Sequence, residues 1–345
     1  MKKQTVFVGL SGGVDSSVAA LRLKKQGYNV VGVFIKVWHP DFMVCNWEQE
    51  RLDAMRVAAH LDIPFLTCDA EEVYKKNVAD YFIAEYLAGR TPNPDVLCNK
   101  EVKFGAFLKF AKDKGADFLA TGHYARKVSG KLYRGIDDNK DQSYFLWALP
   151  DEEMKYVLFP VGDTPKEEIR KEAAKAGIPT ATKQDSQGIC FLGHVDIPEF
   201  LSHYTELKSG NVLDTSGTVI GVHKGALVYT LGQRHGFTLH TKDTGRQQMY
   251  VVGKDISANT ITVSLEPIEA TTSAQITLRD VVLRNSSELV TSVQFRYRQK
   301  PIPASLKKKD DTFIISLLET TDKPASGQSC VFYNKDECVG GGILV

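Results

Sequence analysis

Cysteine is scarce in this chain, and its distribution limits the classes of protein that fit. Six cysteines are spread over 345 residues, and no two of them form a C-x-x-C pair. Thinly spread cysteines argue against a secreted disulfide scaffold. The missing C-x-x-C pairs argue against a conventional structural zinc site or a ferredoxin-like cluster. We therefore expect thiols at rest.

An excess of charge and a long apolar run are also missing. Lys+Arg 43 balance Asp+Glu 42 to a net charge of +1, so a nucleic acid would have to be held by local patches. Neither a secretory signal nor an apolar run long enough to span a bilayer is found, which predicts a cytoplasmic protein with no membrane partner. The composition, 43% hydrophobic and 25% charged, is that of a globular protein with two or three domains.

The most informative stretch that is present is Gly9-Leu10-Ser11-Gly12-Gly13-Val14-Asp15-Ser16-Ser17. It joins an apolar run at 5–8 to a segment with helical spacing at 18–25. Its glycines let the backbone approach an anion, and its serines fall at a helix N-terminus, where the dipole favours negative charge. It is neither a Walker A loop nor a G-x-G-x-x-G fingerprint, so it predicts a nucleotide site of another class. A turn that only caps a helix is the alternative.

The first third of the chain alternates between two patterns. Short β-branched runs at 29–35, 64–67 and 118–121 predict strands, and segments at 47–61, 73–88 and 103–114 predict helices. This alternation builds a parallel sheet whose ligands bind beyond the carboxyl ends of the strands. Long loops are expected around 38–46 and 89–100, a helix at 164–177, and a polar loop at 183–193.

The chain changes character from about residue 213, where short apolar runs are punctuated by glycine. Eight runs predict strands: 217–222, 228–231, 249–252, 260–263, 274–283, 291–298, 312–318 and 329–333. The last four of them suggest a small antiparallel barrel. The charged run 307–311 predicts a solvated turn between two of these strands.

Cys98 and Cys190 are the cysteines whose neighbours suggest chemistry. Cys98 lies three residues after Asp95 in a proline-stiffened segment, and nearby cations would favour its thiolate: Arg90, Lys100 and Lys103. Cys190 lies in the polar loop at 183–193. Each thiol alone could also be a small buried hydrophobe, which is our expectation for the remaining four: Cys45, Cys68, Cys330 and Cys338.

Eight motifs together resemble the bacterial tRNA-specific 2-thiouridylases, the MnmA family of PP-loop ATP pyrophosphatases. In chain order they are 11–17 (SGGVDSS), 91–104 (TPNPDVLCNKEVKF), 121–126 (TGHYAR), 139–146 (NKDQSYFL), 183–193 (KQDSQGICFLG), 229–236 (YTLGQRHG), 296–299 (RYRQ) and 327–333 (GQSCVFY). The resemblance implies an α/β protein in three parts. These are a parallel-sheet PP-loop domain, adenine nucleotide alpha hydrolase-like, at 1–200; a small, mostly-β, tRNA-binding domain at 201–266; and an antiparallel β-barrel at 267–345.

The resemblance also implies the reaction. It is the ATP-dependent 2-thiolation of the wobble uridine, U34, in tRNAs for Lys, Glu and Gln. ATP adenylates the C2 oxygen with release of diphosphate, and sulfur carried as a cysteine persulfide then displaces AMP. The implied partners are tRNA and a sulfur donor, either a cysteine desulfurase or a relay protein. Mg²⁺ is expected to accompany ATP, with Asp15 as the one candidate protein ligand and no metal site otherwise.

Roles for individual residues follow from motif position. Cys190 is implied to receive the persulfide sulfur, and Cys98 to be the nucleophile that helps release it, leaving a disulfide to be reduced in each cycle. Asp95 is implied to be a base or orienting group. The implied ATP-binding residues are Gly9, Leu10, Ser11, Gly12, Gly13, Val14, Asp15, Ser16, Ile35 and Gly122. The implied tRNA-binding residues are Asn93, Pro94, Asp95, His123, Lys140, Asp141, Gln142, Arg296, Tyr297 and Gln328.

One stretch departs from the family, and three alternatives stay open. Residues 37–43 depart from the usual family text, which commonly has Asn just before the Trp and acidic residues after it, so the contacts of this loop are not carried over. The first alternative is another ATP pyrophosphatase, such as an amidotransferase-type or lysidine synthetase, which needs no cysteine pair. The second is a non-catalytic tRNA-binding protein. The third is an iron–sulfur cluster at Asp95, Cys98 and Cys190.

Overall fold

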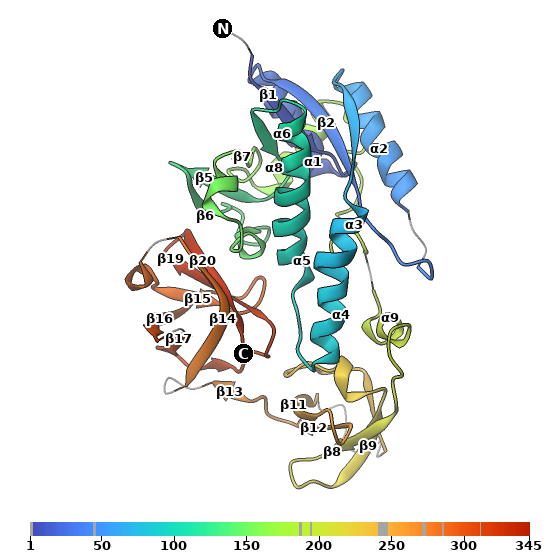
Figure 1. Cartoon of the computed structure of the whole chain (residues 1–345), viewed down its shortest axis with the longest axis vertical. Coiled ribbons are helices and arrows are strands. Elements are labelled where there is room, and N and C mark those ends of the chain that lie inside the picture. The colour runs from blue at the N-terminus through green and yellow to red at the C-terminus, as the bar shows by residue number, and fades with distance from the viewer. Residues whose placement is uncertain are drawn as a thin grey trace. The chain divides into compact units, whose positions relative to one another are not determined.

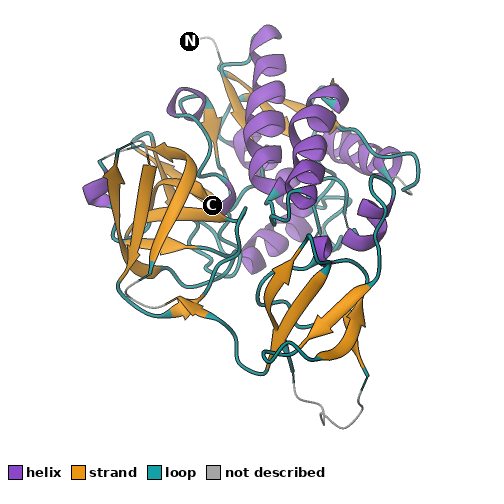
Figure 2. Ribbon diagram, turned by 60° about the horizontal axis from the view of Figure 1, so that its bottom comes forward, coloured by secondary structure: helices purple, strands orange, loops and turns teal. Residues whose placement is uncertain are grey.

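The computed structural model describes residues 3–43, 46–185, 188–193, 195–240, 248–270, 274–284, 286–310 and 312–345. Figure 1 shows the path of the chain, and Figure 2 distinguishes its helices from its strands. The contacts between residues divide the chain into two compact units. The first contains Met1–Ala79, Pro94–His194 and Tyr333–Gly340, and the second contains Asp80–Asn93, Val195–Phe332 and Gly341–Val345.

A five-stranded parallel sheet forms the core of the first unit. Its order is β3-β2-β1-β4-β7, and its strands are β1 (Thr5–Gly9), β2 (Asn29–Lys36), β3 (Phe65–Asp69), β4 (Phe118–Ala120) and β7 (Val157–Leu158). The central strands read as continuous apolar runs because both faces are covered. The chain order reverses between β1 and β4, which in such sheets marks the ligand crevice.

Three amphipathic helices contribute to the core around this sheet. They are α1 (Val14–Lys25), α2 (Trp47–His60) and α8 (Lys166–Lys175). Each helix contributes one fully buried side chain to the hydrophobic cluster that also contains residues of β1: Val18, Val57 and Ile169. The same unit holds β5 (Ala125–Val128), β6 (Lys131–Arg134), η3 (Ser143–Phe145) and α7 (Asp151–Met154).

Two long helical stretches each contain a π-helical segment. The first runs through α3 (Glu71–Tyr74), η1 (Lys75–Ala79) and α4 (Asp80–Leu87), and the second through α5 (Pro94–Leu97), η2 (Cys98–Ala106) and α6 (Phe107–Asp113). The predicted loop around 89–100 is therefore wrong in its second half. Pro94 starts a helix there, because proline fits a first turn whose N–H has no helical partner. Asp95 and Cys98 consequently lie on a helix.

The second unit is mostly β. Its first sheet, of order β10-β9-β8-β12-β11, comprises β8 (Gly210–Leu213), β9 (Val219–His223), β10 (Phe237–Leu239), β11 (Tyr250–Asp255) and β12 (Thr260–Ser264). The short elements are α9 (Ile197–Ser202), η4 (Ala226–Val228), β13 (Glu269–Ala270), η5 (Ser287–Leu289) and β18 (Thr321–Asp322). The prediction of a strand at 228–231 is wrong, because the 3-10 helix η4 ends at Val228 and residues 229–231 belong to no strand.

An antiparallel barrel follows in order β14-β17-β16-β15-β19-β20, closed by pairing of β14 with β20. Its strands are β14 (Gln275–Leu283), β15 (Ser292–Gln294), β16 (Ile302–Lys309), β17 (Thr312–Leu317), β19 (Ser329–Asn334) and β20 (Glu337–Leu344). Lys307 to Lys309 end β16 instead of forming the predicted turn, which begins at Asp310. The expected α/β class, parallel sheet and C-terminal barrel are confirmed.

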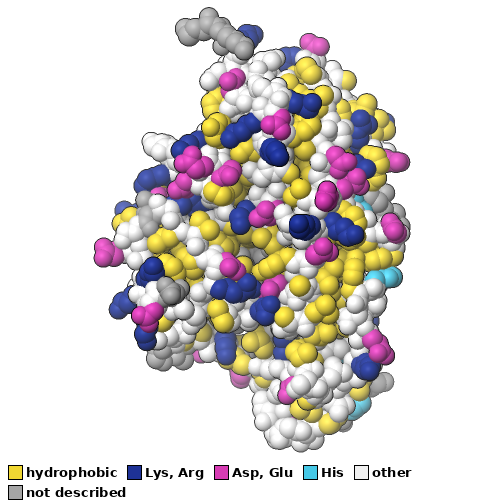
Figure 3. All heavy atoms as spheres, viewed as in Figure 1, with side chains coloured by type: hydrophobic (Ala, Val, Ile, Leu, Met, Phe, Trp, Pro, Cys, Tyr) yellow, Lys and Arg dark blue, Asp and Glu magenta, His cyan; other side chains and the backbone are white. Residues whose placement is uncertain are grey.

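Surface charge and helix hydropathy agree with the composition. Figure 3 shows basic and acidic side chains interspersed on the face drawn, as expected for a net charge of +1. Among the helices that the structure describes, none combines the length and apolarity needed to cross a membrane.

Candidate functional site

The glycine- and serine-rich loop connects β1 to α1, as the sequence predicts. Gly12 has φ +70°, and a Cβ there would lie 2.7 Å from Asp53 Cβ on α2, so only glycine fits. Ser17 Oγ donates to Gly13 O at 2.7 Å, and Gly13 at the helix start has no side-chain cap. The serines therefore do not cap the helix, which disfavours the reading of this loop as a simple cap. Leu10 and Val14 are buried, so they offer only backbone atoms.

The other predicted nucleotide residues surround this loop. A Cβ on Gly122 would lie 2.6 Å from Ser16 N, so the residues after β4 touch the backbone at the start of α1. A Cβ on Gly9 would lie 3.8 Å from Ile35 Cδ1, and Ile35 is 6% exposed on β2. Gly9, Ile35, Gly122 and the loop are therefore brought together at the carboxyl end of the sheet.

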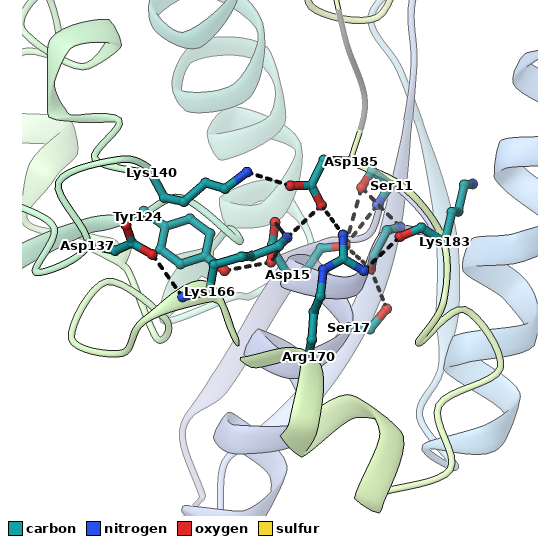
Figure 4. Close-up of polar contacts among 12 residues, drawn as sticks. Ser11, Asp15, Ser17, Tyr124, Asp137, Lys140, Lys166, Arg170, Lys183 and Asp185 are labelled. Carbon is teal, nitrogen blue, oxygen red and sulfur yellow. Dashed lines mark hydrogen bonds and ion pairs between the residues drawn. The ribbon is translucent and has the colours of Figure 1, made fainter. Parts of the chain in front are cut away.

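A network of charged side chains lies at the start of α1 (Figure 4). Lys166 Nζ is 2.6 Å and 2.8 Å from the two carboxylate oxygens of Asp15, and Tyr124 OH donates to Asp15 Oδ1 at 2.8 Å. The same Lys166 Nζ lies 2.7 Å from Asp185 Oδ1. The network thus joins the loop to the chain segment that leads to Cys190.

Further cations complete this network. Arg170 and Lys140 each lie 2.7 Å from an oxygen of Asp185, and Lys183 Nζ lies 2.8 Å from Asp53 Oδ2. Although burial opposes it, hydrogen bonds from Lys140 and Lys166 lower the pKa of Asp185 to about 2. The carboxylate is therefore ionised at neutral pH. Four cations face three carboxylates beside a loop suited to anions.

Cys98 and Cys190, 92 residues apart in sequence, meet in the folded chain. Their sulfur atoms are 3.2 Å apart, and both thiols are free. Cys98 Sγ donates a hydrogen bond to Cys190 Sγ at this separation, and the two sulfurs are not covalently joined, because a disulfide spans about 2.05 Å. The two thiols are thus placed for exchange with each other. Among the described residues, no group of three or more His, Cys, Asp or Glu side chains is arranged to hold a metal ion.

The segment carrying Cys190 is held as a tight hairpin. Ile189 and Gly193 exchange backbone hydrogen bonds of 2.8 Å, and Phe191 between them has φ +67°. Asp95 Oδ1 accepts the Cys190 N–H at 2.8 Å, and Tyr74 OH donates to Cys190 O at 2.9 Å. Two helices far from Cys190 in sequence, α5 with Asp95 and α3 with Tyr74, therefore position this cysteine.

The divergent stretch at 37–43 also contacts this hairpin. His39 Nε2 lies 3.0 Å from Phe191 O, and its Nδ1 lies 3.1 Å from Val37 O. The first of these contacts ties the stretch to the hairpin. A role for this stretch in supporting the cysteine hairpin was not visible in the sequence.

The two thiols differ in acidity. Burial, with the neighbouring Cys190, raises the pKa of Cys98 well above its usual value, which contradicts the expected activation of Cys98 by nearby cations. The hydrogen bond from Cys98, with the charge of Lys103, lowers the pKa of Cys190 despite its burial. Lys103 Nζ lies 5.6 Å from the centre of the Phe191 ring, next to Cys190. Cys190 is therefore the thiol that loses its proton more readily.

This difference predicts the effect of removing the Lys103 charge. We expect Lys103→Met to raise the pH midpoint of Cys190 alkylation by iodoacetamide by about one unit, since an opposite charge nearby favours the thiolate. At neutral pH the reaction should be up to about tenfold slower. Peptide mass spectrometry over a pH series measures this. Lys109→Met, an exposed lysine on α6, is the control; an unchanged midpoint in Lys103→Met would contradict the assignment.

Burial distinguishes the predicted tRNA-binding residues of the first unit. Lys140 is part of the charge network described above. His123 is 8% exposed, and burial, with the charge of Lys103, lowers its pKa well below the usual value, which leaves a neutral ring bonded to Thr121 Oγ1 at 2.7 Å. Asp141 is 4% exposed and accepts from Arg134 Nε at 2.9 Å.

The remaining predicted residues are only partly buried. Gln142 Oε1 accepts the Tyr124 N–H at 3.0 Å, and Pro94 opens the helix that carries Asp95. In the second unit, Arg296 NH1 lies 3.5 Å from Asp322 Oδ2, and Gln328 Oε1 accepts the Ala325 N–H at 3.3 Å. Asn93 and Tyr297 are half-buried in the same unit. Contact of any of these residues with tRNA stays a prediction.

The other cysteines and the missed residues complete the site. Cys68, Cys330 and Cys338 are buried on strands, as expected, whereas Cys45 lies outside the described residues. Sequence reasoning missed the roles of Tyr74, Lys166 and Arg170. Lys166 and Arg170 occupy positions i and i+4 of the predicted helix at 164–177, a spacing that places both on one face. That spacing was the available signal.

Comparison with known proteins assigns the family. Residues 4–194 match the family described as tRNA methyl transferase HUP domain, residues 198–265 the tRNA methyl transferase PRC-barrel domain, and residues 273–344 the Aminomethyltransferase beta-barrel domain. A solved 4-thiouridine synthetase–RNA complex with bound ATP is similar at 20% identity and a TM-score of 0.36, over 58% of this chain and 50% of that one.

Two relatives match almost throughout. The tRNA-specific 2-thiouridylase MnmA of Streptococcus thermophilus (strain ATCC BAA-491 / LMD-9) is 43% identical over 357 residues, covering 99% of this chain and 95% of that protein. The protein of the same name from Lysinibacillus sphaericus is 42% identical over 352 residues, covering 98% and 93%. The resemblance inferred from the eight motifs is thereby confirmed. This chain belongs to the tRNA-specific 2-thiouridylase family, a family of tRNA sulfurtransferases.

Proposed function

We propose that this protein uses ATP and a cysteine persulfide to convert the C2 oxygen of the wobble uridine of tRNA into sulfur. The observation that carries the proposal is the 3.2 Å approach of Cys98 Sγ to Cys190 Sγ in the unit that also holds the anion-binding loop. The names of the relatives support thiolation of tRNA. The labels of two matched families mention methyl transfer instead, a reaction that does not call for paired thiols.

The nucleotide part of the proposal rests on the loop between β1 and α1. ATP is taken as the substrate that donates AMP: the uridine C2 oxygen attacks the α-phosphorus, and diphosphate leaves. The proposed ATP-binding set is Gly9, Leu10, Ser11, Gly12, Gly13, Val14, Asp15, Ser16, Ile35 and Gly122. Mg²⁺ would neutralise phosphate charge beside Asp15, whose carboxylate already binds Lys166 and Tyr124, so phosphate oxygens would supply most of its ligands.

The sulfur part uses both thiols. Cys190 carries the persulfide, and the Cys98 thiolate attacks Cys190 Sγ. The bond between Cys190 Sγ and the terminal sulfur breaks, HS⁻ leaves, and a Cys98–Cys190 disulfide forms. HS⁻ then attacks C2 of the adenylated uridine, and AMP departs. A cellular dithiol returns two electrons and two protons to the disulfide. The short distance between the sulfurs supports this exchange.

Asp95 is suited to take a proton in this sequence. It precedes Cys98 by three residues on one helix, which places both on the same face. Burial raises the pKa of its carboxyl, against the hydrogen bond from the Cys190 N–H and the charge of Lys103, and a raised pKa brings a carboxylate closer to the range useful for a general base. We propose that Asp95 accepts a proton from Cys98 or orients the uridine.

Binding of tRNA is proposed for the residues that the family motifs indicate. They are Asn93, Pro94, Asp95, His123, Lys140, Asp141, Gln142, Arg296, Tyr297 and Gln328. We propose that tRNAs for Lys, Glu and Gln are the substrates and that a desulfurase or relay protein supplies sulfur.

The proposed domains are 1–200, 201–266 and 267–345.

The deciding experiment is nucleoside mass spectrometry. Unmodified tRNA is incubated with the protein, ATP, a persulfide donor and a dithiol. We expect 2-thiouridine at position 34, with one AMP and one diphosphate formed per sulfur. Diphosphate without 2-thiouridine would point to another ATP pyrophosphatase, and neither product would point to a tRNA-binding protein without catalysis. Anaerobic purification with an absorbance spectrum tests the iron–sulfur alternative.

A further inference from the structure

Asp185 is enclosed by cations to an unusual degree. Lys140, Lys166 and Arg170 each place a nitrogen 2.7 Å from its carboxylate, and Figure 4 shows Lys166 and Arg170 of α8 and Lys140 of another segment converging on it. The Asp185 side chain is only 26% exposed, and that of Lys166 only 8%. One carboxylate thus occupies donors that could serve a more highly charged anion.

One of the cations that hold Asp185 also belongs to the loop between β1 and α1. Lys166 also binds both oxygens of Asp15 in the loop, so one ammonium connects the loop to Asp185. An anion bound at the loop is therefore close to the cations that hold Asp185.

A polyphosphate chain is the ligand these donors fit best. Arg170 presents a planar fork, Lys166 and Lys140 present ammonium groups, and all three lie in the network that begins at the N-terminus of α1. Phosphate oxygens carry more charge than one carboxylate and accept more hydrogen bonds. A diphosphate group entering this network would compete directly with Asp185.

We propose that Asp185 is an internal competitor for the β- and γ-phosphates of the nucleotide: it occupies Lys166, Arg170 and Lys140 when no nucleotide is bound, and the phosphates displace it from them on binding. This inference rests on the proposed use of ATP. It makes the three cations part of the phosphate site and Asp185 the group that lowers the affinity of that site.

The first test measures affinity for α,β-methylene-ATP by isothermal titration calorimetry. Asp185→Asn should bind it about three- to tenfold more tightly, because the competing charge is gone. Arg170→Gln should bind it more weakly. Glu172→Gln is the matched control, since Glu172 also lies on α8, is 25% exposed and pairs with Arg22 instead. Equal or weaker binding by Asp185→Asn would overturn the proposal, whereas a wild-type protein that binds no analogue would overturn the proposed function as well.

The second test compares wild type and Asp185→Asn with AMP, which lacks the β- and γ-phosphates. We expect the two proteins to bind AMP with equal affinity, because AMP brings no phosphate to the three cations that Asp185 occupies. A gain in affinity for AMP as large as that for α,β-methylene-ATP would refute competition with the β- and γ-phosphates while leaving the proposed ATP use intact.

Discussion

Cys190→Ser is expected to abolish 2-thiouridine formation while nucleotide affinity stays within about twofold of wild type. A serine oxygen cannot carry a transferable sulfur, so the loss is chemical and should be at least about a thousandfold, the scale seen when an essential nucleophile is removed. The Cys190 backbone makes the hydrogen bonds to Asp95 and Tyr74, and serine keeps both. Nucleoside mass spectrometry and calorimetry measure the two quantities.

A second substitution separates the roles of the two thiols. Cys98→Ser should also stop turnover, but it should retain a persulfide on Cys190 after exposure to a sulfur donor, visible as the mass of one added sulfur on that peptide. Cys68→Ala removes a buried thiol of the parallel sheet and should leave thiolation near wild type. Substantial 2-thiouridine from Cys190→Ser would refute the persulfide assignment, and absence of the added sulfur in Cys98→Ser would refute the order of steps.

The parallel sheet and the loop could be predicted from the sequence because their signals are local. Alternation of apolar runs with helical spacing occurs within short windows, and the nonapeptide at 9–17 carries its own strand–turn–helix context. The barrel was predicted in class, but β16 and β20 were missed. The lysines ending β16 were interpreted as a turn, and the glycines of β20 weaken a strand pattern.

The helix that carries Asp95 and Cys98 shows why the cysteine site was predicted only in part. Two prolines near Asn93 read as loop signals, yet Pro94 supplies the first turn of a helix. The π-helical segment that starts at Cys98 is a rare backbone form without a sequence signature. Cations near in sequence suggested an activated Cys98, but burial has the larger effect and raises its pKa.

The charge network could not be predicted, because its members come from segments up to 170 residues apart. Lys166 and Arg170 read as the solvated face of a helix, a pattern shared by most surface helices. Only folding against α1 and the segment at 183–185 reveals their carboxylate partners. Motif reasoning therefore located the nucleotide loop and the thiols, whereas the ion pairs around the loop required tertiary structure.

Gly122→Ala is expected to weaken nucleotide binding and thiolation by about a hundredfold, because it separates β4 from the loop. The added Cβ would lie 2.6 Å from Ser16 N and 2.8 Å from Asp15 C. Both are backbone atoms at the start of α1, and they cannot rotate away as a side chain would. A displacement of about 1 Å at an active site costs on the order of 100-fold in rate. Overpacking should also cost about 1–3 kcal/mol of stability.

Gly253→Ala provides the matched control for this substitution. Its added Cβ would lie 3.5 Å from Thr262 Cβ, an ordinary contact, so both binding and the denaturation midpoint should stay near wild type. Calorimetry with α,β-methylene-ATP, thermal denaturation and nucleoside analysis give the three readouts. A Gly122→Ala protein with wild-type nucleotide affinity would show that the residues after β4 do not form the nucleotide site. Loss of stability with normal affinity would limit Gly122 to packing. The combined loss that we expect follows from a glycine that lets two backbone segments meet at the point where the strand order reverses.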